Sequence, residues 1–512
     1  MAVKILPVVH EEPNMSGIKS YEFETECSLG ESKQPKSKWT RLLVCTTLGS
    51  TFGAAVPGGY CVGIINSPAV HMRAWVHDTL GKNYGLLLST TALDTFWALI
   101  VSIYLIGGVL GSAAAGWAAN RFGRRGCFLL SGLLLLIGAA CFLCCRWMHS
   151  VELLLLGRVI VGLGSGLITT SLPMYHSEIA SISQRGTLGV GCALGFSIGL
   201  VFAQIFSLQS VFGGEDHWHI ALCFYVIFMT VCYAPYRFYA ESPKWLFIVK
   251  HRREEARLML QRLRGNVNPA VIDEEMAAME LETQSKCSTR RLGEILRDPR
   301  MLLPLVLLFA YQGGQQLSGV NAIFYYSVLI FRNSGLSASA AEWMNLCAGN
   351  VNLLTALMSP LFMAKFNRRI LMQLSTFFCA VFLFAFAWMV EYSAQVPWFS
   401  ITCMASIFLY LIAFQLALGP MPSFIGAELF EVSSRSVALS LGNQIGWACN
   451  FIVGMIFPAL HTAWGSWVFL LFSMFSALLF LLTKFYLPET RGREISYVAK
   501  LVSRGFRSNV HQ

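Results

Sequence analysis

Long apolar segments alternate with short polar ones along most of the chain. Each apolar segment is long enough to cross a bilayer as an α-helix. The pattern predicts an all-α membrane protein with twelve transmembrane helices, and an even number of spans places both termini on one side. The predicted spans fall at about 42–65, 96–119, 127–147, 152–174, 187–208, 219–239, 302–330, 341–364, 370–391, 398–430, 436–460 and 465–487.

The segment from 241 to 300 breaks this pattern because charged residues are frequent in it. Two sets of apolar residues recur there at the spacing of one helical face: Ala256, Leu260 and Leu263, then Ile272, Met276 and Met279. This favours a linker of short amphipathic helices at the cytoplasmic face over a separate folded domain. The expected parts are a tail (1–41), a six-helix half (42–240), the linker (241–300), a second six-helix half (301–487) and a tail (488–512).

Composition and charge agree with a membrane protein. The chain is 55% hydrophobic and 13% charged, whereas a soluble domain is nearer a quarter charged. The net charge of +10 indicates no nucleic-acid partner, because the basic residues gather in alternate loops such as Arg121–Arg125 and Lys365–Arg369. The positive-inside rule makes those loops and both termini cytoplasmic. We expect a multi-pass protein of the plasma membrane, embedded in a lipid bilayer, and the sequence predicts no oligomeric state.

One apolar segment carries four uncharged amides. Gln312, Gln315 and Gln316 share a helical face, whereas Asn321 would lie nearly opposite Gln312 on a straight helix. Ser318–Gly319 is a place where the helix can unwind and return Asn321 to the same side. Amides donate and accept hydrogen bonds without net charge, which suits a neutral polyhydroxyl ligand. The alternative is that they join packed helices, but four amides with three glycines among them favour the ligand.

Charged residues mark corresponding places in the two halves, and the gap from glutamate to arginine is seven residues in both. Such a parallel repeat of six spans is typical of transporters. We expect these residues to pair as a cytoplasmic charge latch that holds one state of the protein. The alternative is that charged residues simply favour this interface, but the matched gap favours the latch. The latch residues are Arg124, Arg125, Glu178, Arg185, Glu241, Arg368, Arg369, Glu428, Arg435 and Glu489.

At these residues the chain resembles the sugar porters of the major facilitator superfamily, and among them the animal facilitative hexose transporters. The resemblance covers about residues 40–495. The sequence motifs of the second half are closer to those of the fructose-type branch than to those of the glucose-type branch. The matching motifs are Gly58–Tyr60, Asn66–Pro68, Asn120–Arg125, Gly157–Arg158, Pro173–Tyr175, Glu178, Arg185–Gly186, Glu241–Pro243, Gly314–Ala322, Gly419–Pro420, Glu428–Phe430, Asn450–Gly454 and Pro488–Arg493.

The resemblance implies a substrate cavity between the two halves that opens to each side in turn. Tyr325 and Tyr326 match the outer gate of the broken seventh span. Trp447 matches an aromatic residue that lines the inner cavity, with an ordinary helix-packing indole as the alternative. The amides that match sugar-binding positions are Gln312, Gln315, Gln316, Asn321, Asn352 and Asn450.

The chain departs from the family pattern at several cavity positions. A fifth-span glutamine of the family is Ala193, a tenth-span tryptophan is Ser423, a tenth-span glutamate is Gln415, and an eleventh-span polar residue is Gly446. The seventh-span amides are thus kept while part of the first-half wall is lost. Each lost hydrogen-bonding partner costs ~0.5–1.5 kcal/mol, so we expect weaker or altered sugar selectivity.

The expected function is facilitative (uniport) transport of a hexose such as glucose or fructose. Proton coupling needs a carboxyl group within the membrane, and the first span has no Asp or Glu from Leu42 to Ile65. Asp94 is expected to cap the second span, and the arginines near Glu178 and Glu428 are expected to lower the pKa of both carboxyl groups. The alternatives are a transporter-like sugar sensor and a carrier of a polyol or urate. No catalytic, metal-binding or cofactor motif is found, so neither an enzyme nor a cofactor is expected.

Overall fold

The computed structural model describes residues 39–507, with gaps at 87, 182–183, 266–267, 286–291, 334–335, 393–396, 431, 492–497, 499–500 and 503–504. Most of the two predicted tails, 1–41 and 488–512, lies outside the described residues. The side chains of Arg185 and Arg435 also lie outside them.

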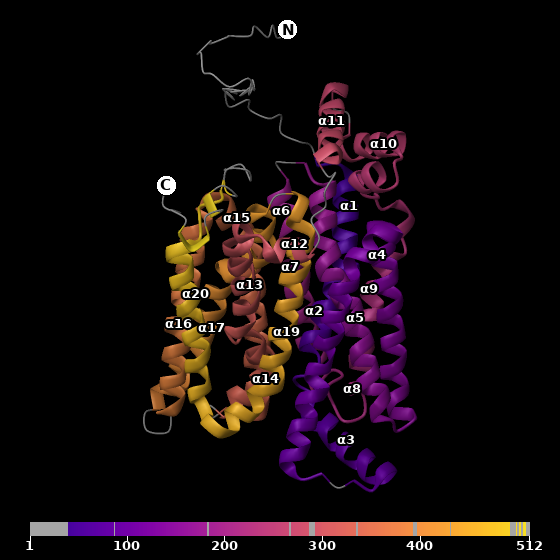
Figure 1. Ribbon diagram of the computed structural model, residues 1–512. Helices are drawn as coiled ribbons and strands as arrows, with labels where there is room; N and C mark the ends of the chain where they lie inside the picture. Colours follow the sequence, from indigo (N-terminus) through magenta and orange to yellow (C-terminus); the bar gives the residue numbers. More distant parts are fainter. Residues whose placement is uncertain are drawn as a thin grey trace, which may run out of the picture. The chain divides into compact units, whose positions relative to one another are not determined.

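The first half is built of helices (Figure 1). Its first span is bent, because a π-helical turn that widens the helix lies between its two α-helical parts. Its second and third spans form one long helix that turns sharply at Gly123, where φ is +81°. The elements are α1 (Arg41–Ser50), η1 (Thr51–Ala55), α2 (Val56–Gly63), α3 (Ala69–Tyr84), α4 (Thr90–Trp147), α5 (Val151–Ile179), α6 (Arg185–Gly189), α7 (Gly191–Phe206), α8 (Trp218–Cys223) and α9 (Tyr225–Tyr233).

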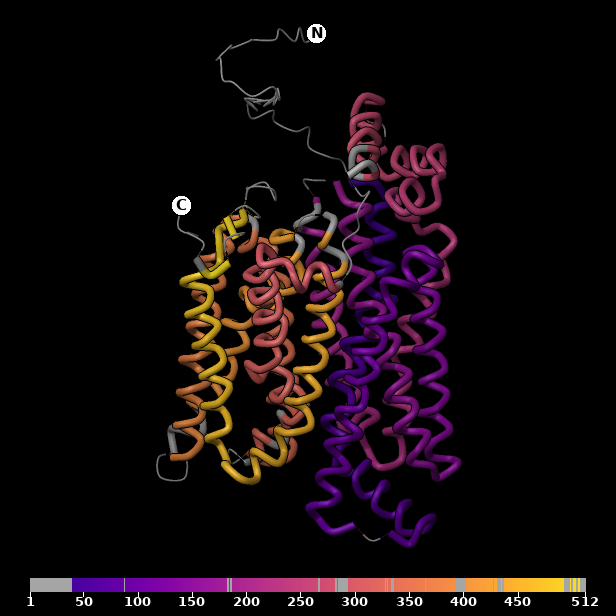
Figure 2. Tube along the Cα trace, viewed as in Figure 1, coloured from indigo at the N-terminus to yellow at the C-terminus, as the bar shows by residue number. Residues whose placement is uncertain are grey.

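The second half repeats this plan, with its first span broken in the middle. In Figure 2 the two parts of that span run alongside α19, against which both pack. The elements are α13 (Leu302–Leu317), α14 (Val320–Asn333), α15 (Ala338–Lys365), α16 (Arg368–Glu391), α17 (Pro397–Ala413), η6 (Phe414–Leu418), α18 (Met421–Leu429), α19 (Val432–Trp464), η7 (Gly465–Trp467), α20 (Val468–Tyr486) and η8 (Gly505–Arg507).

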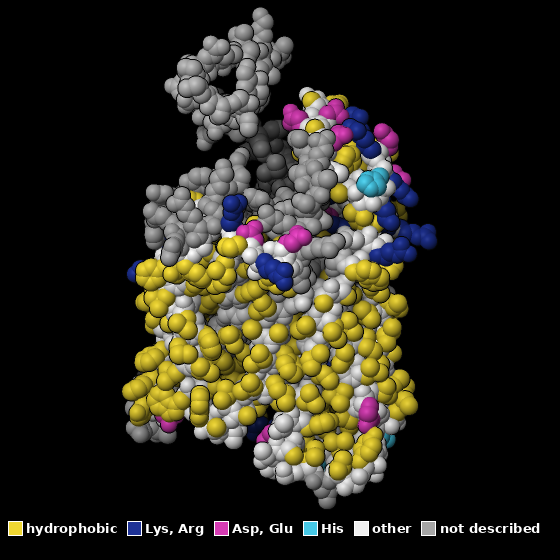
Figure 3. Space-filling view, viewed as in Figure 1, with side chains coloured by type: hydrophobic (Ala, Val, Ile, Leu, Met, Phe, Trp, Pro, Cys, Tyr) yellow, Lys and Arg dark blue, Asp and Glu magenta, His cyan; other side chains and the backbone are white. Residues whose placement is uncertain are grey.

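The described helices are consistent with the twelve predicted spans. Eight stretches are long and apolar enough to cross a membrane, and two of them, Thr90–Trp147 and Val437–Tyr486, each contain two predicted spans. The two remaining spans are divided into shorter helices, at Trp218–Tyr233 and across α13 and α14. Hydrophobic side chains cover the surface along these helices in Figure 3, as a lipid-facing surface requires. Among the described residues the fold is helical throughout.

The linker is helical, as predicted. After η2 (Tyr236–Phe238), which ends the first half, it contains η3 (Trp245–Val249), α10 (Arg253–Arg264), α11 (Pro269–Ser285), α12 (Leu292–Arg297) and the start of η5 (Pro299–Met301). The apolar faces of α10 and α11 pack on each other through Leu260 and Met276. Arg264 ties this pair to the first half, because its guanidinium donates to the carbonyls of Ile179 (2.8 Å) and Ala180 (3.2 Å) at the end of α5. A cation is favourable at that helix end.

Glycines allow α4 and α5 to touch through their backbones. A Cβ on Gly107 would lie 2.2 Å from the Val159 carbonyl oxygen, and one on Gly166 would lie 2.2 Å from the Gly108 carbonyl oxygen. Arg158 of α5 is buried in the same half, where it donates to the carbonyls of Cys61 and Val101, each at 2.9 Å. These contacts fix the position of α5.

The prediction that Asp94 caps the second span is wrong. Ser89 is the N-cap of α4, and its side chain accepts from the Ala92 amide. Asp94 instead pairs with Arg73 of α3. The carboxylate is one turn into the helix, too far along it to reach the first free amides.

Candidate functional site

The seventh predicted span breaks at Ser318–Gly319, as the sequence predicts. Gly319 has φ of +85°, a conformation that other residues rarely adopt, and a Cβ there would lie 2.3 Å from the Phe472 ring. The Tyr410 hydroxyl donates to the Ser318 carbonyl at 2.9 Å and holds the break in place. The break returns Asn321 to the side of the earlier amides, and its Nδ2 donates to Oε1 of Gln316.

Two of the four amides hold helices together in this conformation. Gln312 Nε2 donates to the Pro422 carbonyl (3.0 Å) and to Oδ1 of Asn443 (3.1 Å). Gln315 Nε2 donates to the carbonyls of Leu418 (3.0 Å) and Gly419 (2.5 Å). These carbonyls lie where the π-helical turn η6 ends, and the Leu418 carbonyl is four residues before Pro422, which has no N–H to offer it. The alternative reading of these amides as links between helices therefore applies to Gln312 and Gln315.

The other two amides form a chain that remains partly exposed. Gln316 Nε2 donates to Gln315 Oε1 at 3.2 Å, and Gln316 Oε1 accepts from Asn321. Neither side chain is fully buried. The Gln316–Asn321 pair is thus the part of the predicted site that is best placed to exchange its partners for a ligand.

Helix α19 brings three further residues to the interface of the two halves. Trp447 donates from Nε1 to the Thr169 hydroxyl of α5 (3.2 Å), and its ring lies edge-on to Tyr104 at 5.8 Å. Asn450 accepts from the Tyr325 hydroxyl at 3.4 Å. Asn443, which the sequence analysis missed, donates to Thr170 at 3.4 Å while it accepts from Gln312. Its spacing from Trp447 and Asn450 places all three on one helical face, a signal that could have identified it.

The two predicted gate tyrosines, Tyr325 and Tyr326, lie on α14 and are buried against α19. Tyr326 donates to the Gly454 carbonyl at 3.0 Å and stacks on Phe457 at 5.2 Å. Beside them Asn66, which follows α2, donates to the carbonyl of Phe324 at 2.9 Å and so joins the two halves. The halves are therefore in contact at this end, which is opposite the arginine-rich turns.

Helices α7 and α15 form a second seam between the halves. Gln204 Nε2 donates to Oδ1 of Asn345 at 2.8 Å, and Asn352 Nδ2 donates to the Ser197 hydroxyl at 3.3 Å. All four side chains are buried. Among the described residues, each bond leaves one buried amide oxygen without a partner, Oε1 of Gln204 and Oδ1 of Asn352. Of these four residues, sequence reasoning identified only Asn352.

The predicted latch residues of the first half form one cluster, here called the first charge cluster (Arg124, Arg125, Glu178, Glu241). Arg124 makes a two-pronged ion pair with Glu178, with distances of 2.6 and 2.8 Å. The backbone amides of Arg124 (3.1 Å) and Arg125 (3.4 Å) donate to the Glu241 carboxylate. Ser242 donates from its hydroxyl to Glu178. Burial raises the pKa of the Glu241 carboxyl despite these hydrogen bonds.

The second charge cluster (Arg368, Arg369, Glu428, Glu489) repeats the first. The amides of Arg368 (3.0 Å) and Arg369 (3.2 Å) donate to Glu489, and Thr490 donates to Glu428 as Ser242 donates to Glu178. Arg368 and Glu428 are 3.8 Å apart. Among the described residues, the ion pairs of each cluster join helices of one half and not the two halves to each other.

The prediction that nearby arginines lower the pKa of Glu428 is wrong. Burial is the largest influence and raises the pKa of this carboxyl, and it outweighs Arg368 and the Thr490 hydroxyl. The distance from Arg368 to Glu428 (3.8 Å) is longer than that from Arg124 to Glu178 (2.6 Å). This explains why the Arg368 guanidinium lowers the pKa of Glu428 less than expected.

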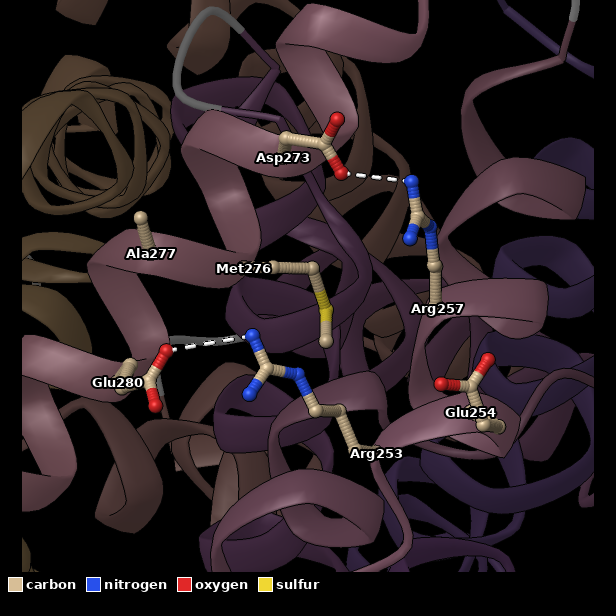
Figure 4. Close-up of a pocket in the computed structure, with 7 residues that line it drawn as sticks. All are labelled: Arg253, Glu254, Arg257, Asp273, Met276, Ala277 and Glu280. Atoms are coloured by element: carbon tan, nitrogen blue, oxygen red, sulfur yellow. Dashed lines mark hydrogen bonds and ion pairs between the residues drawn. The ribbon is translucent and has the colours of Figure 1, made fainter.

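A cavity of about 260 Å³ lies on the linker, away from these amides (Figure 4). Its walls are Arg253, Glu254, Arg257, Asp273, Met276, Ala277 and Glu280. The charges largely neutralise one another, because Arg257 pairs with Asp273 at 2.7 Å and Arg253 with Glu280 at 3.4 Å. The cavity is a surface hollow between α10 and α11 and does not belong to the site between the halves.

A comparison with known families decides the class of protein. The family model described as "Sugar (and other) transporter" matches residues 46–501. The chain belongs to this sugar transporter family. The predicted resemblance is therefore confirmed, and the protein is a multi-pass membrane transporter and not an enzyme.

Relatives of this sugar transporter include facilitated glucose transporters of vertebrates. It is 34% identical to the sheep (Ovis aries) solute carrier family 2, facilitated glucose transporter member 3, over 86% of this chain and 89% of the relative. It is 32% identical to member 1 of chicken (Gallus gallus), over 92% and 95%. Among solved structures, the proton:xylose symporter XylE has a TM-score of 0.74 at 21% identity, covering 90% of this chain and 99% of XylE. The major facilitator fold is thus confirmed.

Proposed function

We propose that this chain is a facilitative uniporter that moves a hexose such as glucose or fructose down its gradient by alternating access. Relatives named facilitated glucose transporters, similar over most of the chain, support the class of solute. The observation that carries the proposal is the break at Ser318–Gly319, which leaves Gln316 and Asn321 partly exposed and bonded to each other. Their bonds can be exchanged for sugar hydroxyls without a change of charge.

The proposed binding site consists of Gln312, Gln315, Gln316, Asn321, Asn352, Trp447 and Asn450, with Tyr325 and Tyr326 as the gate. Gln316 and Asn321 contact the solute, whereas Gln312 and Gln315 support the helices that carry them. Trp447 and the Ser197–Asn352 contact belong to the interface that changes when the halves rock. The neutral chemistry of these groups supports a neutral polyhydroxyl solute.

The two charge clusters make each half rigid at its basic end, and we assign that end to the cytoplasm together with both termini. The residue pattern of the loops supports this orientation, and the proposed membrane is the plasma membrane. In this proposal the parts 42–240 and 301–487 move as two bodies joined by the linker 241–300. A charge latch between the halves requires Arg185 or Arg435, since the described pairs stay within each half.

The test is uptake of labelled glucose and fructose into liposomes that contain the purified protein. Equilibration without accumulation, unaffected by an imposed proton gradient, supports uniport. Accumulation that a protonophore abolishes contradicts it. Binding without flux indicates a sugar sensor, and stronger competition by a polyol or by urate than by hexoses reassigns the solute.

A further inference from the structure

The first-half wall of the proposed site contains a hydroxyl that the sequence analysis did not consider. Ser197 lies one helical turn after Ala193 on α7, and the side chain faces Asn352 of α15 across the seam between the halves. The Ser197 hydroxyl oxygen is 3.3 Å from Nδ2 of Asn352 and 3.1 Å from the Ala193 carbonyl oxygen. Both side chains are buried, with 6% and 5% of their surface exposed.

The hydrogen bonds fix which way the Asn352 amide faces. A serine hydroxyl has one hydrogen to donate, and Ser197 gives it to the Ala193 carbonyl. The hydroxyl oxygen can then only accept, so Asn352 must present its NH2 group to Ser197. This leaves Oδ1 of Asn352 on the other side of the amide, buried and without a partner in the part of the chain that the structure describes. A buried acceptor without a donor is rare, because it has lost its water and gained nothing in return.

We infer that Ser197 is a positioning residue that determines solute specificity at Asn352. By holding the NH2 group, it keeps Oδ1 free to accept a hydrogen bond from a solute hydroxyl. The subsite then requires a group that donates. It rejects a group that can only accept, since two acceptors would face each other without a hydrogen between them. The inference rests on the proposed function and adds the direction of one hydrogen bond to it.

The prediction is tested with analogues that separate donation from acceptance. In a deoxy sugar one hydroxyl is replaced by hydrogen, whereas in a deoxyfluoro sugar it is replaced by fluorine, which accepts weakly and cannot donate. Both series, substituted at each ring position in turn, are measured as inhibitors of labelled hexose uptake in liposomes. For the wild-type protein we expect one position at which the deoxy analogue is weakened by roughly two- to tenfold and the fluoro analogue more than the deoxy analogue, because its fluorine faces another acceptor.

Three variants of Ser197 and one control variant isolate the role of the hydroxyl. In Ser197→Ala the amide can turn over and donate, so the fluoro analogue at that position should bind better than the deoxy analogue. Ser197→Thr retains a hydroxyl and should restore the wild-type order. Ser171→Ala is the matched control, because Ser171 is also buried and also donates to a carbonyl one turn earlier, at 2.7 Å, but has no amide partner. Ser197→Cys, similar in size with weak hydrogen bonding, is measured as well in case the alanine variant does not fold.

The outcomes distinguish this inference from the proposed function. If wild-type protein neither binds nor transports hexoses, the proposed function fails. If it transports them and Ser197→Ala or Ser197→Cys retains the wild-type order of every fluoro and deoxy pair, the positioning role of Ser197 is overturned. If Ser171→Ala changes the order as much as Ser197→Ala does, the effect is a general loosening of the helices and the inference is also overturned.

Discussion

Gln204 and Asn345 form a 2.8 Å hydrogen bond between two buried amides, one from each half of the transporter. The bond is possible because Gly349 lies one turn after Asn345. A Cβ at Gly349 would lie 1.8 Å from Oε1 of Gln204. In this conformation the end of the Gln204 side chain thus occupies the space that a side chain at residue 349 would need.

We expect Gly349→Ala to hold this seam apart and to lower hexose uptake severalfold, because the conformation with the seam closed becomes costly. Adding Gln204→Ala should restore much of the uptake, since it removes the group that collides. Gly116→Ala is a control, because a Cβ there meets nothing within 4 Å. Uptake and surface expression are measured together. A double variant no better than Gly349→Ala would contradict the proposed collision.

Glu241 and Glu489 are expected to stabilise their halves in the same way. Each carboxylate accepts from two consecutive arginine amides, and a glutamine places an NH2 group against these donors. Glu241→Gln and Glu489→Gln should each lower the free energy of unfolding by ~1–3 kcal/mol. Thermal unfolding in detergent measures the effect. Glu255→Gln, an exposed control, should change it by less than ~0.5 kcal/mol, and equal effects in all three variants would contradict this account.

Glu428 should make stability depend on pH in mild acid. Because burial raises its pKa in the folded protein, the folded state keeps a proton that the unfolded chain has already released. Stability from this group is fully present below the unfolded pKa and is lost as the pH rises through the folded pKa. Wild-type protein should therefore gain stability relative to Glu428→Gln as the pH falls from 7 towards the ordinary glutamate value. Melting temperatures of both proteins across this range provide the test, and parallel curves would contradict it.

Gln316 and Gln315 should respond differently to truncation. Gln316→Ala and Asn321→Ala are expected to lower apparent hexose affinity by roughly two- to tenfold with little change in melting temperature. Gln315→Ala should chiefly lower the melting temperature, since two carbonyls of the η6 turn lose their donor. Binding and melting are measured on the same preparations. Unchanged affinity in both Gln316→Ala and Asn321→Ala would exclude this pair from the site.

The sequence predicted the break in the seventh span because its causes are local. Glycine tolerates a positive φ, and the count of amides around it was sufficient to indicate a polar site. The partners of Gln312 and Gln315 were not predictable in the same way. They are the carbonyls of Leu418, Gly419 and Pro422 and the side chain of Asn443, all more than a hundred residues further along the chain, and hydropathy does not reveal which of these groups the fold brings to the two amides.

Spacing drew attention to the charged residues but did not predict the pairs that the structure describes. Glu178 and Arg185 stand out by their repeated gap, whereas the described partner of Glu178 is Arg124, brought close by the turn at Gly123. The pKa of Glu428 was also misjudged, because burial depends on packing that charge pattern alone does not contain. Ser197 was missed because a single serine in an apolar helix gives no sequence signal. Its role becomes visible only when its neighbour across the seam, Asn352, is known.

Trp447 and Gly108 show one further property of the interface. The indole of one half lies over a backbone in the other half that has no side chain, and a Cβ there would lie 2.5 Å from the ring. The flat indole ring rests on a part of α4 that has no side chain. The two helix surfaces can therefore slide past each other here without a steric barrier from interlocking side chains. In the proposed rocking of the halves, Trp447 must therefore give up its bond to Thr169 and its edge contact with Tyr104, and no interlocking side chain at residue 108 opposes that movement.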